Sequence, residues 1–447
     1  MEPNTTGADT ESVASTPRSR LWLRWVFPAS AQAVQLEHRL TIGRDVDCDA
    51  PLQGSSISRR HAEIYRQGPI FALRDLGSRN GTFLNGERIQ HSVLVRGAVL
   101  RVGEHVGVIE EASAPPAPFG LIADGMCGGN ELNLAFQPLR RASKSNLSVV
   151  VLGATGTGKE RVARSIHDLS GRGGAFHAIN CAALPKELAE SELFGHRKGA
   201  FTGAEGNNLG HFRAAHQGTL FLDEIADLHA LTQAKLLRVL EEGRVTPLGD
   251  TKAIEIDVRV VCAVQRPLPD AVAAGQFRED LMARLSGLTV ALPALRDRRA
   301  DIAPLFQHFI DRYSGGQPPQ LEAKLIECVC LQQWASNVRG LEQLARHLLA
   351  VHGDEPILKR SFLPPELLAL VPAAISNKPG AASTTRGAHD SRRLALALKQ
   401  NGGNVADAAA GLGFSRFRAY RLVGKEGVAT FVSRELAADS PPSALDS

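Results

Sequence analysis

The segment 147–160, which reads LSVVVLGATGTGKE, constrains the fold of this chain more than any other. Its apolar first half predicts a buried strand, and the residues that follow it, RVARSIHDL, have the spacing of an amphipathic helix. Glycines at such a turn let backbone N–H groups converge on phosphate oxygens, and Lys159 can reach the terminal phosphates. Glu160 stands where a serine or threonine usually ligates Mg²⁺. The segment predicts a parallel α/β domain whose nucleotide loop comprises Gly153, Ala154, Thr155, Gly156, Thr157, Gly158, Lys159 and Glu160.

Three further predicted strands of this domain end in polar residues. The apolar run in GTLFLDEIADL ends at Asp223 and Glu224. AFHAIN ends at Asn180, and DVRVVCAVQ ends at Gln265. Because parallel strands place their carboxyl ends at one edge of a sheet, we expect a site there. Asp223 would hold Mg²⁺, directly or through water, and Glu224 would orient and deprotonate the attacking water. The alternative is a carboxylate pair that caps the next helix.

The segment QFREDLMARL contains two arginines that point to a second subunit. Arg278 and Arg284 lie six residues apart in a predicted helix, so they face different sides and do not both serve one local site. One explanation is that at least one of these arginines completes the nucleotide site of a neighbouring subunit. Residues 297–371 are rich in helical patterns and predict a lid that carries Arg339 over the nucleotide.

Residues 21–111 alternate short apolar runs with Gly- and Asn-containing turns, which predicts an all-β sandwich. The turns contain Arg44, Ser58 and Arg79, and arginine with serine can grip a phosphate through charge-assisted hydrogen bonds. Taken alone, a pair such as Asn80–Gly81 is an ordinary hairpin turn.

Residues 391–428 predict two short helices separated by GLGFS, a pattern typical of a helix-turn-helix.

Composition and charge limit the functions of the chain and indicate its domain boundaries. It has 447 residues and a net charge of only +4, so any nucleic-acid surface must be local. From Arg392 to Lys425, seven Lys or Arg stand against one Asp, and the alternative to a DNA surface there is a solvated basic helix pair. The scattered cysteines and the absence of an apolar leader or long apolar run predict a reduced, cytoplasmic protein without membrane contact. The expected divisions are 1–20 disordered, 21–111 β-sandwich, 112–118 linker, 119–296 ATPase subdomain, 297–371 lid, 372–390 linker, 391–436 helix-turn-helix and 437–447 tail.

Several motifs together resemble the AAA+ domain of sigma-54-dependent transcriptional activators. GATGTGKE, INCAALP, ESELFGHRKGAFTGA, GTLFLDEI, KLLRVLEEG and FREDLMARL occur in the family's order across about residues 120–365, and Glu at position 160 is normal there. The resemblance implies a homo-oligomeric ring, commonly a hexamer, with ATP and Mg²⁺ between subunits. It also implies a switch between Asn180 and Glu224, trans roles for Arg278 and Arg284, and a sensor role for Arg339.

This chain departs from that family at two sensor motifs. The first usually reads Thr–Asn and here reads Val264–Gln265, whose longer side chain can still hydrogen-bond. The lid motif usually has Pro–Gly before Asn–Val–Arg and Glu after it, whereas here Ala335–Ser336 and Gly340 stand there. Lys159 and the acidic pair are retained, so hydrolysis of ATP is expected.

The loop GAFTGA matches the segment with which this family engages sigma-54. Its glycines allow the loop to change shape with nucleotide state, and Phe201 and Thr202 would supply the contact. The alternative is a mobile insertion whose Phe201 packs against its own subunit. The residues expected to contact sigma-54 are Gly199, Ala200, Phe201, Thr202, Gly203 and Ala204.

Both flanking blocks also resemble known domains. G-R, S-x-x-H, N-G-T and N-G in this order resemble the forkhead-associated (FHA) domain, which implies phosphothreonine binding at Arg44, Ser58 and Arg79. The resemblance further implies that Arg59 and Asn80 hold the peptide backbone and that His61 braces the loop. GGNVADAA and LGFSR resemble the Fis-type helix-turn-helix, which implies DNA contacts by Arg416, Arg418 and Arg421.

Together these resemblances predict an activator that binds upstream enhancer DNA, hydrolyses ATP and remodels sigma-54 RNA polymerase. The FHA block would recognise a phosphothreonine protein and so implies a Ser/Thr kinase upstream. The main alternative is a phosphopeptide-binding scaffold with weak ATPase activity that does not act on sigma-54. A general AAA+ remodeller of other proteins is a second alternative, which the basic C-terminal unit disfavours.

Overall fold

The computed structural model describes residues 20–28, 33–123, 125–369, 394–399, 404–412, 419 and 423. These residues fall into two compact units. The first contains the described residues before Leu36 together with those from Val99 to Ala369, and the second contains Leu36–Ala98 and the C-terminal segment. Within the part of the chain that is described, no helix has both the length and the apolar character needed to cross a bilayer.

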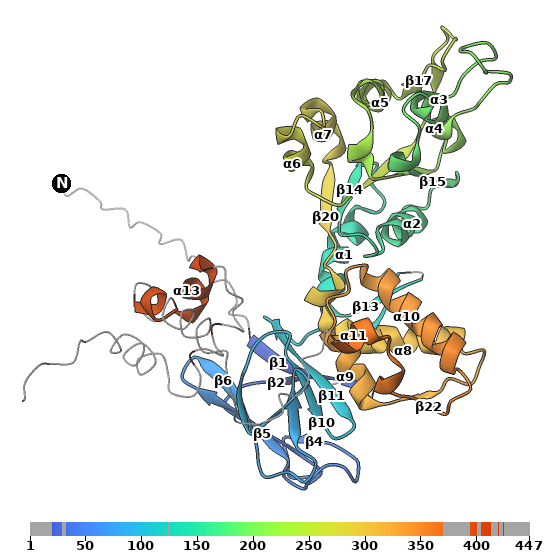
Figure 1. Ribbon diagram of the computed structural model, residues 1–447. Coiled ribbons are helices and arrows are strands. Elements are labelled where there is room, and N and C mark those ends of the chain that lie inside the picture. The colour runs from blue at the N-terminus through green and yellow to red at the C-terminus, as the bar shows by residue number, and fades with distance from the viewer. Residues whose placement is uncertain are drawn as a thin grey trace, which may run out of the picture. The chain divides into compact units, whose positions relative to one another are not determined.

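A five-stranded sheet of parallel strands lies at the centre of the nucleotide domain in the first unit (Figure 1). Its strands, in the order β15-β16-β19-β14-β20, are β15 (Phe176–Asn180), β16 (Thr219–Asp223), β19 (Arg259–Val264), β14 (Val149–Leu152) and β20 (Leu288–Ala291). Register pairs Asn180 with Asp223 and Leu152 with Val264, so the polar strand ends meet at one edge. The sequence predicted four of these strands and missed β20, because LTVA is too short an apolar run to identify by itself.

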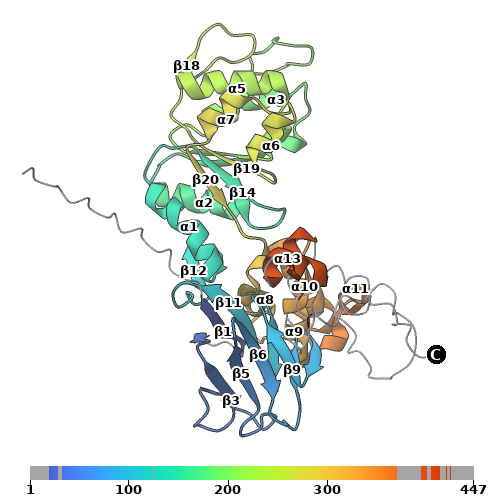
Figure 2. The same ribbon diagram turned by 90° about the vertical axis from the view of Figure 1, so that its left-hand side faces the viewer.

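Helices and short hairpins connect these strands. Gly171, after α2 (Lys159–Ser170), and Gly243, after α5 (Ala230–Glu242), adopt left-handed φ values of 69° and 65°, which is how glycine commonly ends a helix. Figure 2 shows α5 with α6 (Leu268–Ala273) and α7 (Glu279–Leu285) gathered at one end of the strands β14, β19 and β20. The elements are β12 (Gly120–Ala123), β13 (Met126–Gly128), α1 (Asn130–Ala142), α2 (Lys159–Ser170), α3 (Ala189–Phe194), α4 (His211–Ala214), α5 (Ala230–Glu242), β17 (Arg244–Val245), β18 (Ile254–Glu255), α6 (Leu268–Ala273) and α7 (Glu279–Leu285).

The lid is helical, as the sequence predicted. Leu325, Ile326, Leu341 and Leu348 are fully buried, so the apolar stripes of its helices face a common core. Its elements are the 3₁₀ turns η3 (Leu295–Asp297) and η4 (Arg299–Asp301), α8 (Ile302–Tyr313), β21 (Gln320–Leu321), α9 (Ala323–Leu331), α10 (Asn337–His352), β22 (Ile357–Leu358), η5 (Arg360–Phe362) and α11 (Pro365–Ala369).

Four antiparallel strands of the first unit pack on the lid. They are β2 (Ala33–Gln35), β1 (Arg20–Phe27), β11 (His105–Ala112) and β10 (Val99–Val102), paired in that order. Val99 and Val106 belong to the same apolar core as the lid helices. A buried ion pair at 2.6 Å joins Arg101 Nε on β10 to Glu327 Oε2 on α9. β1 begins at Arg20, one residue before the predicted boundary of the sandwich.

The second unit contains a five-stranded sheet and a hairpin. The sheet has the order β4 (Ala50–Pro51), β3 (Arg39–Gly43), β5 (Ala62–Gln67), β6 (Ile70–Asp75) and β9 (His91–Leu94), antiparallel except for the β3–β4 pair. The hairpin joins β7 (Thr82–Leu84) to β8 (Glu87–Ile89). Asn85 and Gly86 form its turn with φ values of 53° and 83°, as a two-residue hairpin loop requires.

The described C-terminal residues are helical. Residues 394–399 and α13 (Val405–Gly411) bury a small core that includes Leu394, Leu398 and Ala408. Ala419 and Val423, which lie four residues apart, are buried in the same core. Arg416, Arg418 and Arg421 lie outside the described residues.

Candidate functional site

A cavity of about 540 Å³ lies where the nucleotide loop, the polar strand ends and the lid meet. All the strand-end residues predicted to share a site, Asn180, Asp223, Glu224 and Gln265, line it. The lid contributes Arg339, as predicted. The other lining residues are Gly125, Met126, Cys127, Leu132, Thr155, Gly156, Thr157, Gly158, Lys159, Glu160, Arg161, Ala182, Asp227, Arg298, Leu305, His308, Phe309, Arg312, Val338 and Glu342.

The nucleotide loop has the geometry expected of a phosphate cradle. Gly158 immediately precedes α2 with φ 102° and Gly156 has φ 76°, conformations that L side chains rarely adopt. Thr157 Oγ1 donates to Ala154 O at 2.8 Å, which closes the loop on itself. Lys159 Nζ is buried at the start of α2 and donates to Gly153 O at 3.0 Å. The loop therefore holds an ammonium group beside the N-terminus of a helix, an arrangement suited to an anion.

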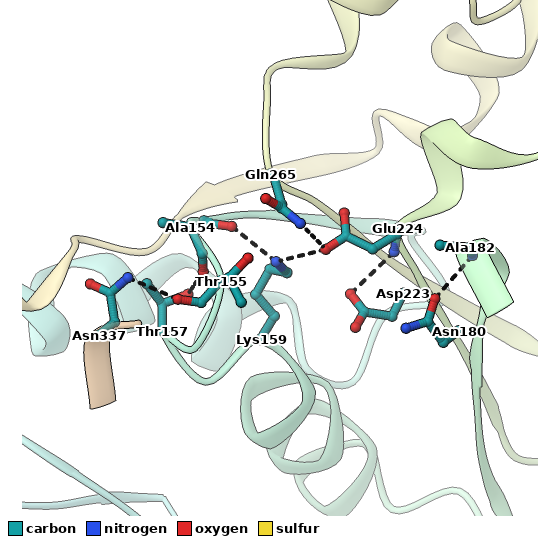
Figure 3. A network of polar contacts seen from close by, with 11 residues as sticks. Ala154, Thr155, Thr157, Lys159, Asn180, Ala182, Asp223, Glu224, Gln265 and Asn337 are labelled. Atoms are coloured by element: carbon teal, nitrogen blue, oxygen red, sulfur yellow. Dashed lines mark hydrogen bonds and ion pairs between the residues drawn. The ribbon is translucent and has the colours of Figure 1, made fainter. Parts of the chain in front are cut away.

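Glu224 is held by two neighbours at the end of β16 (Figure 3). Gln265 Nε2 donates to its Oε1 at 2.7 Å, and Lys159 Nζ lies 3.5 Å from the same oxygen. Glu224 has a left-handed φ of 52°, which is uncommon outside glycine and is often found at functional sites. A carboxylate fixed in this way is placed to serve as a general base next to the nucleotide.

Asp223 lies half-buried beside this pair. One of its oxygens accepts the backbone N–H of Glu224 at 3.1 Å. Burial raises the pKa of the Asp223 carboxyl, and the charge of Glu224 acts in the same direction, while the Lys159 ammonium opposes both. A carboxylate with a raised pKa gains from a nearby cation, so this position suits a bound divalent ion.

Asn180 and the two arginines are placed differently from the simplest expectation. Asn180 lines the cavity, but its Oδ1 accepts from Ala182 N at 2.9 Å, and the contact to Glu224 comes from Gln265. Arg278 is not inside a helix, because its extended backbone caps α7, which begins at Glu279. Arg278 pairs with Asp280 and Arg284 donates to Leu240 O, and neither lines the cavity.

The loop 199–204 forms an exposed tip. Its base is fixed by paired backbone bonds between His196 and Asn208, and Gly199 N donates to Ala204 O at 2.9 Å. Phe201 keeps 36% of its surface exposed and meets the His196 ring edge-on, with centroids 5.0 Å apart. Thr202 is exposed beside it. The aromatic side chain is therefore only partly covered by its own subunit, between the two alternatives drawn from the sequence.

The predicted phosphopeptide loops lie together in the second unit. Arg79 N donates to Ser58 Oγ at 3.2 Å, and Asn80 Nδ2 donates to Ser56 O at 2.7 Å, which joins the two loops. Arg44 follows β3, and its N–H donates to Ser58 O at 3.0 Å. The guanidinium-bearing residues of the set, Arg44, Arg59 and Arg79, are exposed. Loops that are joined at Ser58 and carry three exposed arginines have the composition of a phosphate site.

His61 braces these loops, as expected. Its fully buried ring accepts from Ser58 N at Nδ1 and contacts Gly81 O through Nε2, at 3.1 and 3.2 Å. The ring must therefore be neutral, with its proton on Nε2. Burial lowers the pKa of His61, while the bond to Gly81 and the charge of Asp75 oppose that shift.

Sequence matches identify the domains built in this way. Residues 127–291 match the family described as Sigma-54 interaction domain. This part of the chain is a sigma-54 interaction domain. An FHA domain matches residues 40–103, and an AAA+ ATPase lid domain matches residues 296–378. The sigma-54 interaction domain is therefore preceded by an FHA domain and followed by the lid that completes its AAA+ module.

Two curated relatives of this chain are named as regulators of transcription. The sigma54-dependent transcriptional activator SfnR of Pseudomonas putida is 50% identical over 220 residues, covering 48% of this chain and 60% of SfnR. The DNA-binding transcriptional regulator NtrC of Rhizobium meliloti (strain 1021) is 39% identical over 291 residues, covering 63% of this chain and 60% of NtrC. The crystal structure of NtrX from Brucella abortus with ADP aligns with TM-score 0.50 and 30% identity over 65% of this chain and 67% of NtrX. The chain thus spans about 60% of the length of these curated relatives.

Sequence reasoning missed two residues of the sites. Asp75 accepts hydrogen bonds from Gly77 N, Ser78 N and Thr82 Oγ1, which shapes the loop that carries Arg79. An aspartate two residues before a glycine is a turn signal that could have revealed it. Asn337, at the start of α10, donates a hydrogen bond to Thr155 O in the nucleotide loop. No local sequence pattern predicts this contact.

Proposed function

We propose that this chain is an ATP-hydrolysing activator of sigma-54 RNA polymerase, regulated through phosphothreonine recognition by its FHA domain. The observation that carries the proposal is the convergence of Lys159, Glu224 and Gln265 at one end of the cavity, in a chain that also carries a sigma-54 interaction domain. AAA+ domains of this class in NtrC-like activators are ATPases.

The residues of the cavity fit a nucleotide with a divalent cation. The cavity offers the neighbouring carboxylates of Asp223 and Glu224 at the end of β16. Mg²⁺ is often held by one or two carboxylates, with phosphate oxygens and water completing its coordination. Asp223 would hold the cation, which when bound neutralises charge on the phosphates. Asn180 lies close enough to the cavity to contact the same region, and Arg339 would bind the nucleotide from the lid.

Side chains of this protein account for the remaining steps of ATP hydrolysis. Nucleotide phosphates draw Lys159 away from Glu224 by charge, since the ammonium now faces a stronger anion. Glu224, still held by Gln265, then accepts a proton from the attacking water. Arg278 and Arg284 would complete the site of a neighbouring subunit in a ring, which is consistent with their position outside this subunit's cavity.

The exposed loop 199–204 would contact sigma-54 through Phe201 and Thr202. Its flanking glycines, Gly199 with φ 80° and Gly203 with φ 96°, provide the backbone freedom that a moving tip needs. In the FHA domain, Arg44, Ser58 and Arg79 would bind the phosphate of a phosphothreonine, and Arg59 and Asn80 would hold the peptide. The C-terminal segment 391–436 would bind upstream DNA through Arg416, Arg418 and Arg421.

Open-complex formation at a sigma-54 promoter tests this proposal. Purified protein, sigma-54 polymerase and ATP should yield open complexes, and the Lys159→Ala variant should yield none. If the wild-type protein binds a phosphothreonine peptide but neither hydrolyses ATP nor opens the promoter, it acts as a phosphopeptide scaffold instead.

A further inference from the structure

Asn337 begins helix α10 of the lid, and its side chain reaches the nucleotide loop (Figure 3). Only 2% of its surface is exposed, and its φ of 49° is a conformation that asparagine tolerates better than most residues. Its backbone N–H donates to Trp334 O at 2.7 Å, and the Trp334 indole donates to Val329 O at 3.0 Å. The lid itself therefore fixes the backbone at this helix start.

Both ends of the Asn337 side-chain amide are engaged. Nδ2 donates to Thr155 O in the nucleotide loop at 2.8 Å, and Oδ1 accepts from Leu295 N at 2.9 Å. Leu295 begins η3, the first element of the lid, which follows the last strand of the sheet along the chain. One buried amide at the start of α10 thus joins the nucleotide loop to the beginning of the lid.

The neighbours of Asn337 reinforce this junction. Val338 N donates to Gly156 O at 3.0 Å, and a Cβ placed on Gly156 would stand 2.1 Å from Ser336 O. In a planar trans peptide, the carbonyl and the N–H of the next residue point in opposite directions. Because the carbonyls of Thr155 and Gly156 face the lid, the N–H groups of Gly156 and Thr157 turn to the other side of the loop, where Thr157 N donates to Ala154 O at 3.3 Å. The lid contact therefore sets the orientation of these two peptide groups within the nucleotide loop.

We propose that Asn337 is a positioning residue, which ties the backbone orientation of the nucleotide loop to the position of the lid. The inference rests on the proposed ATPase function. Arg339, two residues further along α10, lines the cavity, so the same helix start carries one side chain toward the nucleotide and one onto the loop. Movement of the lid is transmitted to the phosphate cradle through the Asn337 amide.

The Asn337→Asp variant of the full chain tests the proposal. It keeps the size of the side chain and an acceptor for Leu295 N, but it places a carboxylate oxygen against the Thr155 carbonyl. We expect its affinity for ADP, measured by titration calorimetry, and its kcat/KM for ATP to fall about tenfold or more. Lys324→Gln, at an exposed lid position, should change neither value. An ADP affinity and kcat/KM within about twofold of wild type in Asn337→Asp would overturn the proposal.

Two further measurements guard against a variant that fails to fold. Asn337→Gly retains the left-handed backbone and loses both side-chain bonds, so it should show the same loss of ADP affinity. In the wild-type protein, saturating ADP should slow hydrogen exchange at the Val338 amide together with the amides of residues 155–157. Protection of the loop without any change at Val338 contradicts the coupling, whichever variants fold. A wild-type protein that binds ADP but hydrolyses no ATP would refute the ATPase function alone and leave these ADP measurements to decide the role of Asn337.

Discussion

The side-chain amide of Gln265 donates a 2.7 Å hydrogen bond to the carboxylate of Glu224, and both residues line the nucleotide cavity. The two side chains come from the ends of neighbouring strands, β19 and β16. Gln265, at the sensor position where the family that this domain resembles is expected to have asparagine, therefore holds the proposed general base.

Loss of the Gln265 amide should slow hydrolysis more than it weakens binding. We expect Gln265→Ala to lower kcat for ATP hydrolysis about tenfold with KM little changed, because Glu224 loses the partner that keeps it aligned. Gln333→Ala, which removes an exposed lid glutamine, should behave as wild type. Steady-state kinetics of the two variants would test this prediction. A Gln265→Ala protein with a raised KM and an unchanged kcat would contradict it.

Arg278 and Arg284 should act on a neighbouring subunit. Glu224→Gln and either arginine-to-alanine variant should each be nearly inactive, and a mixture of the two proteins should recover about a quarter of wild-type ATPase activity in randomly mixed rings. The recovery arises where an intact Glu224 meets an intact arginine from the next subunit. A mixture as inactive as its components would show that the arginine tested does not act on the site of a neighbouring subunit.

The nucleotide domain was predictable from sequence because its signals are local. A strand, a glycine loop and a helix follow one another in residues 147–170, and each depends on its own residues. The placement of Arg278 was not predictable, since a helical sequence pattern does not show that the backbone is still extended at the residue before the helix begins. The partner of Glu224 was equally hidden, because Asn180 and Gln265 end strands on either side of β16.

In the FHA loops, sequence order located the arginines but not the groups that support them. Ser58 and His61 are close in sequence, and the role expected for His61 is confirmed by its bonds to Ser58 N and Gly81 O. Asp75 was missed because an aspartate at a strand end has many ordinary uses. Only the folded chain shows that it anchors the loop bearing Arg79.

Phosphopeptide binding should weaken in acid through His61. Burial depresses the pKa of His61 in the folded protein, so its contribution to stability is complete above the unfolded value of about 6.5 and is lost as pH falls through the folded pKa. Protonation removes the acceptor that Ser58 N uses. Affinity for a phosphothreonine peptide, measured by fluorescence anisotropy from pH 7.5 to about 5, should therefore fall more steeply in wild type than in His61→Asn.

The comparison with His61→Asn separates two titrations. The peptide phosphate itself loses charge at about pH 6. This change affects binding to the wild-type protein and to His61→Asn equally. Parallel pH curves for the two proteins would mean that the loops do not depend on a neutral His61.

The buried pair Arg101–Glu327 should be a strong determinant of stability. Glu327→Gln removes the negative charge of a buried ion pair while its guanidinium stays in place, and we expect a loss of about 3 kcal/mol or more in the free energy of unfolding. The exposed pair Arg244–Glu255 provides the matched control, where Glu255→Gln should cost about 1 kcal/mol or less. Equal shifts of the thermal transition in the two variants would show that β10 does not bury this charge against α9.

The central claim is that energy from ATP hydrolysis reaches sigma-54 polymerase through the tip of loop 199–204. Thr202→Ala tests it most directly, because Thr202 is exposed at that tip and lies outside the nucleotide cavity. The account predicts an ATPase rate close to wild type together with loss of open-complex formation at a sigma-54 promoter. A Thr202→Ala protein that hydrolyses ATP and still opens the promoter as wild type does would contradict it.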